Sequence, residues 1–181
     1  MFHTISYLKQ GNTRQYRAYK AIKQLNILKD LMDYTPILCG TIPIGVDVKD
    51  SDLDIILEVN DFNHFKTRII KLYGEHEAFT IKQIRIRDTP VIKTNFHYSG
   101  FEFELFGQAK PVHKQYAYLH MIIEYHLLKE MPKLREKVIH LKRQGMKTEP
   151  AFCEILGIKG DPYERLIEIG IEKGIIEWKT L

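Results

Sequence analysis

Asp52 and Asp54, two acidic residues separated by a single aliphatic one, are the residues of this sequence best suited to chemistry. Side chains of a β-strand alternate between its faces, so these carboxylates would project together while Leu53 and Ile55 enter apolar packing. At about 4 Å and an effective dielectric near 20, two such charges repel by roughly 4 kcal/mol, which calls for a cation, a shared proton or a wide separation. A hard divalent ion, Mg²⁺ or Mn²⁺, meets this need most simply.

The residues around these acids predict the elements that position them. Apolar residues recur every three or four positions over 13–32, which predicts an amphipathic helix. A short buried strand would end at Gly40, and a loop containing Pro43 and Gly45 would lead to a second strand over residues 52–58. Residue 60 or 61 would cap a helix that ends near residue 73.

A hairpin is predicted further along the chain. Residues 79–87 favour a third strand and residues 88–90 a break, after which the runs 91–98 and 101–106 would pair through a two-residue turn. That turn would place Asn95 opposite Glu104 and His97 opposite Glu102. One face of the hairpin is then aromatic, and the other carries its polar residues: Lys93, Asn95, His97, Glu102 and Glu104.

After Pro111 the pattern is helical only, with helices predicted over 114–131, up to about residue 144, from residue 148, and from a cap at Asp161 to about residue 174. His120 and Glu124 lie four residues apart in the first of these helices, and we expect an exposed pair. The sequence therefore predicts an α+β protein, with an α/β core over residues 1–111 and a helical unit over residues 112–181 packed on that core.

Composition limits the class of protein. Among 181 residues, 44% are hydrophobic and 28% are charged, which is typical of a globular chain. Cys39 and Cys153 lack the spacing of a metal site, and we expect both to be reduced. The first residues do not resemble a signal peptide, and no apolar run is long enough to span a bilayer, so we expect a cytoplasmic protein with no membrane partner. The net charge of +4 suits a phosphate-bearing ligand but is too small to indicate nucleic acid.

The Gly40-Thr41 turn, followed after ten residues by Asp52-Leu-Asp54-Ile, resembles the signature of the nucleotidyltransferase superfamily with the polymerase β-type fold. The resemblance covers residues 14–108. With Pro43, Gly45 and the segments Phe-Glu-Leu-Phe-Gly-Gln and Lys-Thr-Glu-Pro-Ala-Phe, the pattern is most similar to an uncharacterised bacterial family of this superfamily. The implied fold is a nucleotidyltransferase-like mixed β-sheet flanked by helices and followed by a helical unit.

The resemblance also implies roles for individual residues. The superfamily places a third acid on a neighbouring strand, for which Glu104 is the candidate and Glu102 the alternative. Asp52, Asp54 and Glu104 would then be the catalytic residues and the ligands of Mg²⁺ or Mn²⁺, and a third carboxylate would allow two metal ions roughly 3.5 to 4 Å apart. Nucleotide binding would fall to residues that allow close backbone approach, donate hydrogen bonds or add positive charge: Gly40, Thr41, Ser51 and Lys93.

The function implied is that of a metal-dependent transferase, which moves NMP from a nucleoside triphosphate to a hydroxyl of an unknown acceptor: a small molecule, a protein or RNA. The alternative is a catalytically inactive protein of the same fold that acts as a nucleotide sensor or as a protein partner, for example in a toxin–antitoxin pair. A third hypothesis, that a basic face binds RNA, has less support because aromatic and basic residues are sparsely interleaved.

Overall fold

The computed structural model describes residues 2–177, which divide into two units. The first unit contains the chain up to Pro43 together with Ser51–Val112. The second contains Ile44–Asp50 together with the chain from His113 onward. A short early segment, which ends two residues before Asp52, thus belongs to the second unit.

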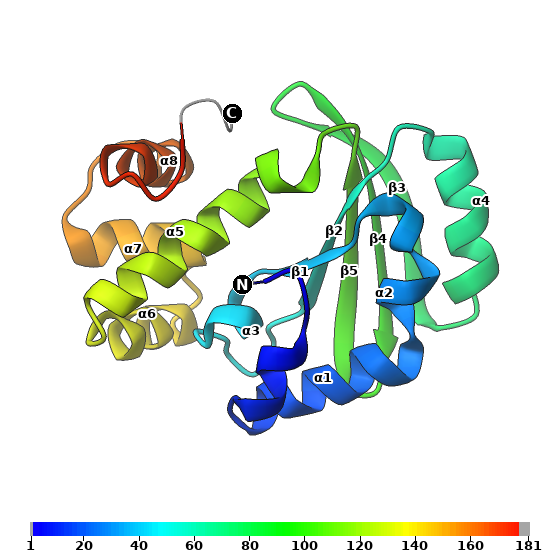
Figure 1. The fold of residues 1–181 in the computed structure, drawn as a ribbon, viewed down its shortest axis with the longest axis horizontal. Coiled ribbons are helices and arrows are strands. Elements are labelled where there is room, and N and C mark those ends of the chain that lie inside the picture. Colours follow the sequence, from blue (N-terminus) through cyan, green and yellow to red (C-terminus); the bar gives the residue numbers. More distant parts are fainter. Residues whose placement is uncertain (1, 178–181) are drawn as a thin grey trace. The chain divides into compact units, whose positions relative to one another are not determined.

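A five-stranded sheet forms the centre of the first unit, with the strand order β1-β2-β5-β4-β3 (Figure 1). Its strands are β1 (Ile37–Cys39), β2 (Leu53–Glu58), β3 (Glu77–Ile86), β4 (Thr89–Tyr98) and β5 (Phe101–Gln108). β2 and β5 pair in parallel, whereas the other neighbours are antiparallel. The expected mixed sheet of an α+β protein is confirmed.

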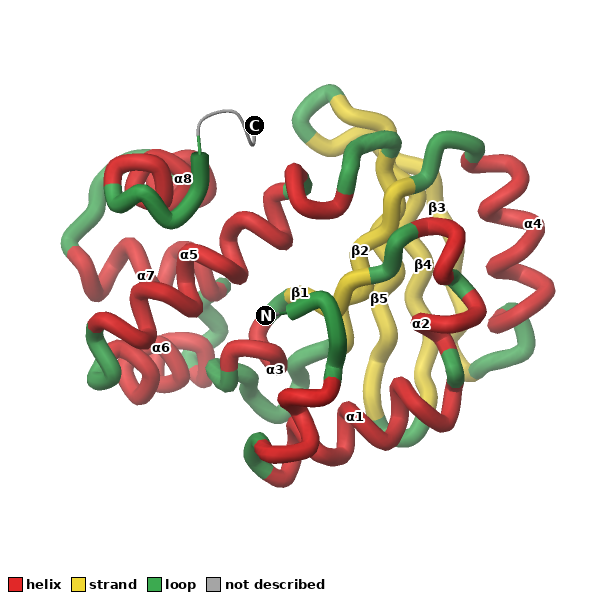
Figure 2. Tube along the Cα trace, in the orientation of Figure 1, coloured by secondary structure: helices red, strands yellow, loops and turns green. Residues whose placement is uncertain are grey.

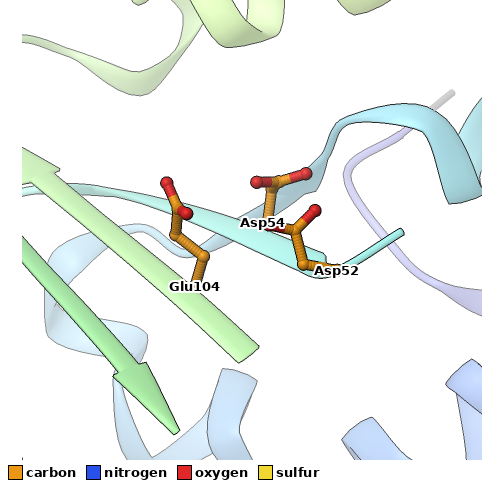
Figure 3. A group of neighbouring side chains, drawn as sticks. All are labelled: Asp52, Asp54 and Glu104. Carbon is orange, nitrogen blue, oxygen red and sulfur yellow. The ribbon is translucent and has the colours of Figure 1, made fainter. Parts of the chain in front are cut away.

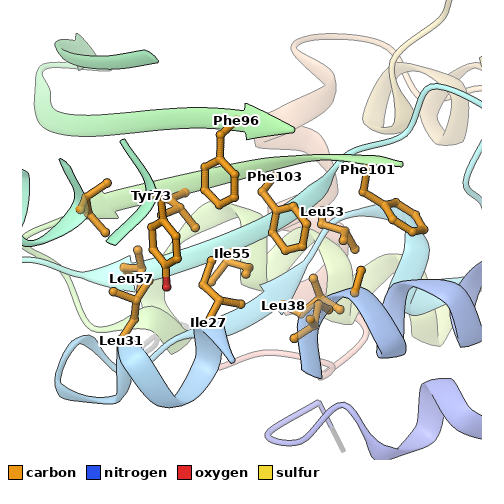
Figure 4. Packing of buried hydrophobic residues seen from close by; sticks show 14 of the residues in the cluster. Ile27, Leu31, Leu38, Leu53, Ile55, Leu57, Tyr73, Phe96, Phe101 and Phe103 are labelled. Atoms are coloured by element: carbon orange, nitrogen blue, oxygen red, sulfur yellow. The ribbon is translucent and has the colours of Figure 1, made fainter. Parts of the chain in front are cut away.

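Helices α1 (Thr13–Leu25), α2 (Ile27–Asp30) and α4 (Phe62–Tyr73) pack on one face of this sheet (Figure 2). Short 3₁₀ helices occupy Ser6–Gln10 and Met32–Tyr34. The core between the layers includes Phe96 and Phe103, whose stacked rings have centroids 5.3 Å apart (Figure 4). Asp61 caps α4, as expected, because its carboxylate accepts from the backbone N–H groups of Asn63 and His64.

The predicted hairpin has the expected register. Asn95 lies opposite Glu104 and His97 opposite Glu102 in the β4–β5 pair. Ser99 and Gly100 form the turn with positive φ values of 51° and 78°, the backbone conformation that a tight two-residue hairpin turn requires. The polar and aromatic faces of this hairpin are therefore separated as predicted.

Two predicted boundaries in this unit are wrong. The helix over 13–32 breaks at Asn26, which adopts a left-handed conformation with φ 58°. The predicted break at 88–90 is instead a second hairpin turn, with Arg87 and Asp88 at φ 48° and 61°, and Pro90 lies within β4. Proline is tolerated there because pairing of β4 with β5 begins only at Ile92.

The second unit contains α5 (Tyr116–Glu130), α6 (Leu134–Arg143), α7 (Thr148–Leu156) and α8 (Pro162–Glu172). A 3₁₀ helix at Val112–Lys114 spans the boundary between the two units. Arg135 Nη1 donates to the carbonyl oxygens of Ile44 and Gly45, at 2.5 and 2.8 Å. These bonds join the early segment Ile44–Asp50 to α6. Across the described residues, every helix is too short or too polar to cross a membrane.

The expected exposed pair of His120 and Glu124 is wrong, because each residue is only 4% exposed. His120 Nε2 donates to the Tyr163 carbonyl oxygen at 2.9 Å, and its Nδ1 lies 3.4 Å from Glu149 Oε1. This side of α5 therefore faces α7 and α8. Helical spacing alone did not distinguish the buried side of α5, since apolar residues occur around much of this helix.

Candidate metal site

Strand pairing brings the candidate acids together. Asp54 lies in β2 directly opposite Glu104 in the parallel strand β5, and Asp52 comes immediately before β2 rather than within it. Leu53 and Ile55 are fully buried in the core beneath the sheet. Because side chains alternate along a strand, the acids lie on the face opposite α1, α2 and α4.

The three carboxylates converge (Figure 3). Each of Asp52, Asp54 and Glu104 offers an oxygen, and these oxygens all lie within 4.8 Å of one another. Among the described residues this is the one group of three or more acidic, histidine or cysteine side chains with such geometry. All three side chains are partly buried. Hard carboxylate oxygens are the ligands that Mg²⁺ and Mn²⁺ prefer, so the donor set fits either ion.

The electrostatics indicate a surplus of negative charge. Burial raises the pKa of the Asp52 carboxyl above its usual value, and the neighbouring charge of Glu104 raises it further. Burial likewise raises the pKa of the Cys39 thiol, with a further contribution from Asp54, which lies opposite it across β1 and β2. A bound cation would relieve this repulsion.

Gly40 provides room for the Asp54 carboxylate. Its φ of 78° lies in the left-handed region, and a Cβ at this position would overlap Asp54 Oδ2. Both the backbone conformation and the close approach therefore favour glycine. The predicted importance of Gly40 gains a second reason here, since it faces one of the acids.

Thr41 and Ser51 lie at the two ends of the connection between β1 and β2. Thr41 Oγ1 donates to Ser51 Oγ at 3.2 Å. Thr41 begins α3 (Thr41–Ile44), a single helical turn where we expected a loop.

Arg14 also contacts this connection, and the sequence did not indicate it. Its Nη2 donates to the Ser51 carbonyl oxygen at 2.7 Å, and its guanidinium lies 5.1 Å from the Phe101 ring centroid. Arginines are common on the polar side of amphipathic helices, so the sequence pattern did not set Arg14 apart as a residue that contacts the site.

The polar residues of β4 and β5 contact one another across the hairpin. Lys93 Nζ lies 2.6 Å from Glu104 Oε2. Glu102 accepts from Asn95 Nδ2 at 2.8 Å and lies 3.9 Å from His97 Nε2. Glu102, the alternative third acid, is therefore engaged elsewhere on the hairpin and is not part of the converging group.

Residues 20–169 match a protein family described as "Domain of unknown function (DUF4269)". This match covers most of the chain, including the three acids. Comparison with curated proteins gives no match.

Two solved structures show the fold. The polymerase core of TRAMP, an RNA surveillance complex, is similar with a TM-score of 0.54 and 13% identity, over 97% of this chain and 57% of that chain. Cid1, an RNA terminal uridylyl transferase, has a TM-score of 0.50 and 15% identity, over 77% of this chain and 46% of that one. This chain thus spans only about half the length of these proteins. The architecture is that of the polymerase β-like nucleotidyltransferases, and the fold expected from the sequence is confirmed.

Proposed function

We propose that this chain, which belongs to the family described as Domain of unknown function (DUF4269), is a metal-dependent nucleotidyltransferase. The observation that carries the proposal is the convergence of Asp52, Asp54 and Glu104 within 4.8 Å on the sheet of a nucleotidyltransferase fold. In the proposed reaction, a hydroxyl oxygen of an acceptor bonds to the α-phosphorus of an NTP. The bond to the bridging oxygen breaks, pyrophosphate leaves, and the hydroxyl proton passes to solvent or a base.

Asp52 and Asp54 would hold Mg²⁺ or Mn²⁺ together with Glu104. When bound, such an ion neutralises phosphate charge and lowers the pKa of the attacking hydroxyl. The chain contributes rigid placement of the ligands: Asp54 and Glu104 are fixed by adjacent parallel strands. Arg14 and Thr41 bond to Ser51 and so orient the segment that leads into Asp52.

The Gly40-Thr41 turn would receive the phosphates of the nucleotide. Glycine at position 40 allows close approach of the backbone, and the hydroxyls of Thr41 and Ser51 could each donate to a phosphate oxygen. Lys93 lies on the same sheet face as the acids and would add positive charge next to the phosphates. The acceptor, whether small molecule, protein or RNA, would supply the hydroxyl.

Transfer of label tests the proposal. Purified protein is incubated with each α-³²P-labelled NTP, cell extract, and either Mg²⁺ or Mn²⁺, and acid-stable labelled products are separated by size. We expect labelling that depends on the metal ion. Asp54→Asn should reduce it by roughly 100-fold or more, because loss of a residue that only supports a metal ligand already costs about 10- to 100-fold. Asp50→Asn removes an exposed aspartate of the same connection and should leave labelling unchanged.

Equal labelling by wild type and Asp54→Asn would refute the enzymatic proposal. Saturable binding of an NTP without any transfer would instead support the inactive nucleotide sensor. Equilibrium dialysis with the same labelled nucleotides measures this binding directly.

A further inference from the structure

One carboxylate of the candidate site already has a cationic side chain next to it. Asp52, Asp54 and Glu104 together carry three negative charges when ionised. The ammonium of Lys93 already neutralises one of them, because its Nζ lies 2.6 Å from Glu104 Oε2. Because Lys93 pairs with Glu104, Asp52 and Asp54 are the carboxylates of this group that it leaves to a metal ion.

Strand geometry fixes the position of Lys93. It lies opposite Phe106 in β5, whereas Glu104 lies opposite Asn95, so Lys93 and Glu104 are diagonal neighbours on one face. Diagonal neighbours across antiparallel strands are within reach of long side chains. Asn95 makes the same diagonal contact with Glu102, which leaves Glu104 facing Lys93.

The pair is also partly shielded from water. The Glu104 side chain is 18% exposed and that of Lys93 is 35% exposed. An ammonium in contact with a carboxylate repels any cation that approaches the same carboxylate. This repulsion is twice as large for a divalent ion as for a monovalent ion at equal distance. Partial burial reduces the screening of this repulsion by solvent and salt.

We propose that Lys93 takes the place of a second divalent cation at Glu104, so that the protein alone binds one divalent ion, held by Asp52 and Asp54. Glu104 then orders the site through its ion pair and reaches the metal only when Lys93 moves away. This inference rests on the proposed function, because it assumes that the acids bind a metal ion. Lys93 is a positioning residue in this arrangement.

The test counts bound metal ions. Mn²⁺ is titrated into the full chain, and the signal of free Mn²⁺ is followed by electron paramagnetic resonance. We expect one Mn²⁺ per wild-type chain. In Lys93→Met we expect a second Mn²⁺ to bind at least tenfold more tightly than any second ion binds to the wild type, whereas Lys93→Arg should retain one ion.

Lys82→Met is the matched control. Lys82 lies directly opposite Lys93 in β3, is exposed, and its loss changes the net charge by the same amount. Partly exposed ion pairs add little to stability, so thermal unfolding of all three variants should stay close to that of the wild type.

The outcomes separate the two proposals. Two Mn²⁺ ions of similar affinity in the wild type, or identical behaviour of Lys93→Met and Lys82→Met, would overturn the role of Lys93 and leave the proposed function standing. A wild-type chain that binds no Mn²⁺ would overturn both.

Discussion

At the scale of single residues, spacing indicated the first two acids, whereas the third came from the resemblance to the nucleotidyltransferase superfamily. Asp52 and Asp54 follow from strand alternation, and the two-residue turn at Ser99 and Gly100 places Glu104 on the polar face of the hairpin. The parallel pairing of β2 with β5, which brings Glu104 next to Asp54, was not predicted. The contact between Lys93 and Glu104 was not predictable. Which diagonal neighbour a long side chain reaches depends on its rotamer, and periodicity carries no information about rotamers.

Gly40→Ala should weaken metal binding. The substitution strains a backbone at φ 78° and places a methyl group against Asp54 Oδ2, so the carboxylate must shift. We expect Mn²⁺ affinity to fall at least tenfold by calorimetric titration. Gly145→Ala is the control, because Gly145 has φ 92° but no atom within 4 Å of an added Cβ.

Both alanines should cost about 1–2 kcal/mol of folding stability from the left-handed backbone alone. The control should therefore lose stability while keeping its metal affinity. Equal metal affinities of the two variants would show that Gly40 does not make room for the ligand.

Glu104→Gln should distinguish the third acid from its alternative. It removes a charge from the converging group and leaves Lys93 next to the remaining carboxylates, so Mn²⁺ affinity should drop by roughly 10- to 100-fold. Glu102→Gln changes a residue that bonds to Asn95 outside the group and should bind Mn²⁺ like the wild type. The reverse order of the two affinities, measured in the same titrations, would assign the site to Glu102.

At the scale of elements, the sequence predicted the helices after Asp61 and Asp161 and the β4–β5 hairpin, since caps and tight turns are local signals. Two kinds of feature were not predictable. The first is a left-handed backbone at a residue other than glycine: Asn26 ends α1, and Arg87 lies in the turn between β3 and β4. Neither position carries a sequence pattern that would have predicted this conformation. The buried side of α5 depended on tertiary packing that its sequence pattern did not encode.

That buried side predicts a pH dependence of stability. Burial raises the pKa of the Glu124 carboxyl well above its usual value; the charge of Glu149 adds to this rise and that of Lys142 opposes it. Burial would also raise the pKa of Glu149, but its hydrogen bond with His120 and the charge of His120 hold that pKa below the usual value. Glu149 therefore stabilises the fold at neutral pH, and this stabilisation disappears in acid.

Glu124 acts in the opposite direction. Because its folded-state pKa is raised, the folded chain keeps a proton that the unfolded chain releases above about pH 4.3, so stability falls as the pH rises. Relative to Glu124→Gln, the wild type should lose up to about 1.4 kcal/mol of unfolding free energy per pH unit above that value, until the folded-state pKa is passed.

Urea unfolding at pH 5, 6, 7 and 8 measures this difference. Glu154→Gln, which changes an exposed glutamate of α7, should follow the wild type at every pH. Parallel pH profiles of wild type and Glu124→Gln would contradict the burial of an acid at this position.

At the scale of the whole molecule, composition and the order of elements predicted an α+β chain with a helical part after the sheet. Packing of the helical part on the core, as expected for residues 112–181, stays a prediction. A contact between distant parts of the sequence escaped prediction. Ile44–Asp50 belongs to the helical unit, and Arg135 bonds to the carbonyls of Ile44 and Gly45.

Arg135→Ala should loosen this segment. Hydrogen bonds from a charged donor contribute about 1.5–3 kcal/mol each, and the variant loses two of them. We expect amide hydrogen exchange over residues 44–50 to speed up at least tenfold, measured by mass spectrometry. Arg143→Ala removes an exposed arginine of the same helix and should leave this exchange unchanged. Equal exchange in both variants would contradict the anchoring role of Arg135.

The central claim is that Asp52 and Asp54 bind a divalent ion next to a nucleotide. A crystal structure of the full chain with Mn²⁺ and a non-hydrolysable NTP analogue, with data collected at the manganese absorption edge, tests it most directly. We predict an anomalous peak within about 2–2.3 Å of oxygens from both aspartates and from the triphosphate, with the phosphates against Gly40 and Thr41. A bound nucleotide whose metal ion lies away from these aspartates would contradict the claim.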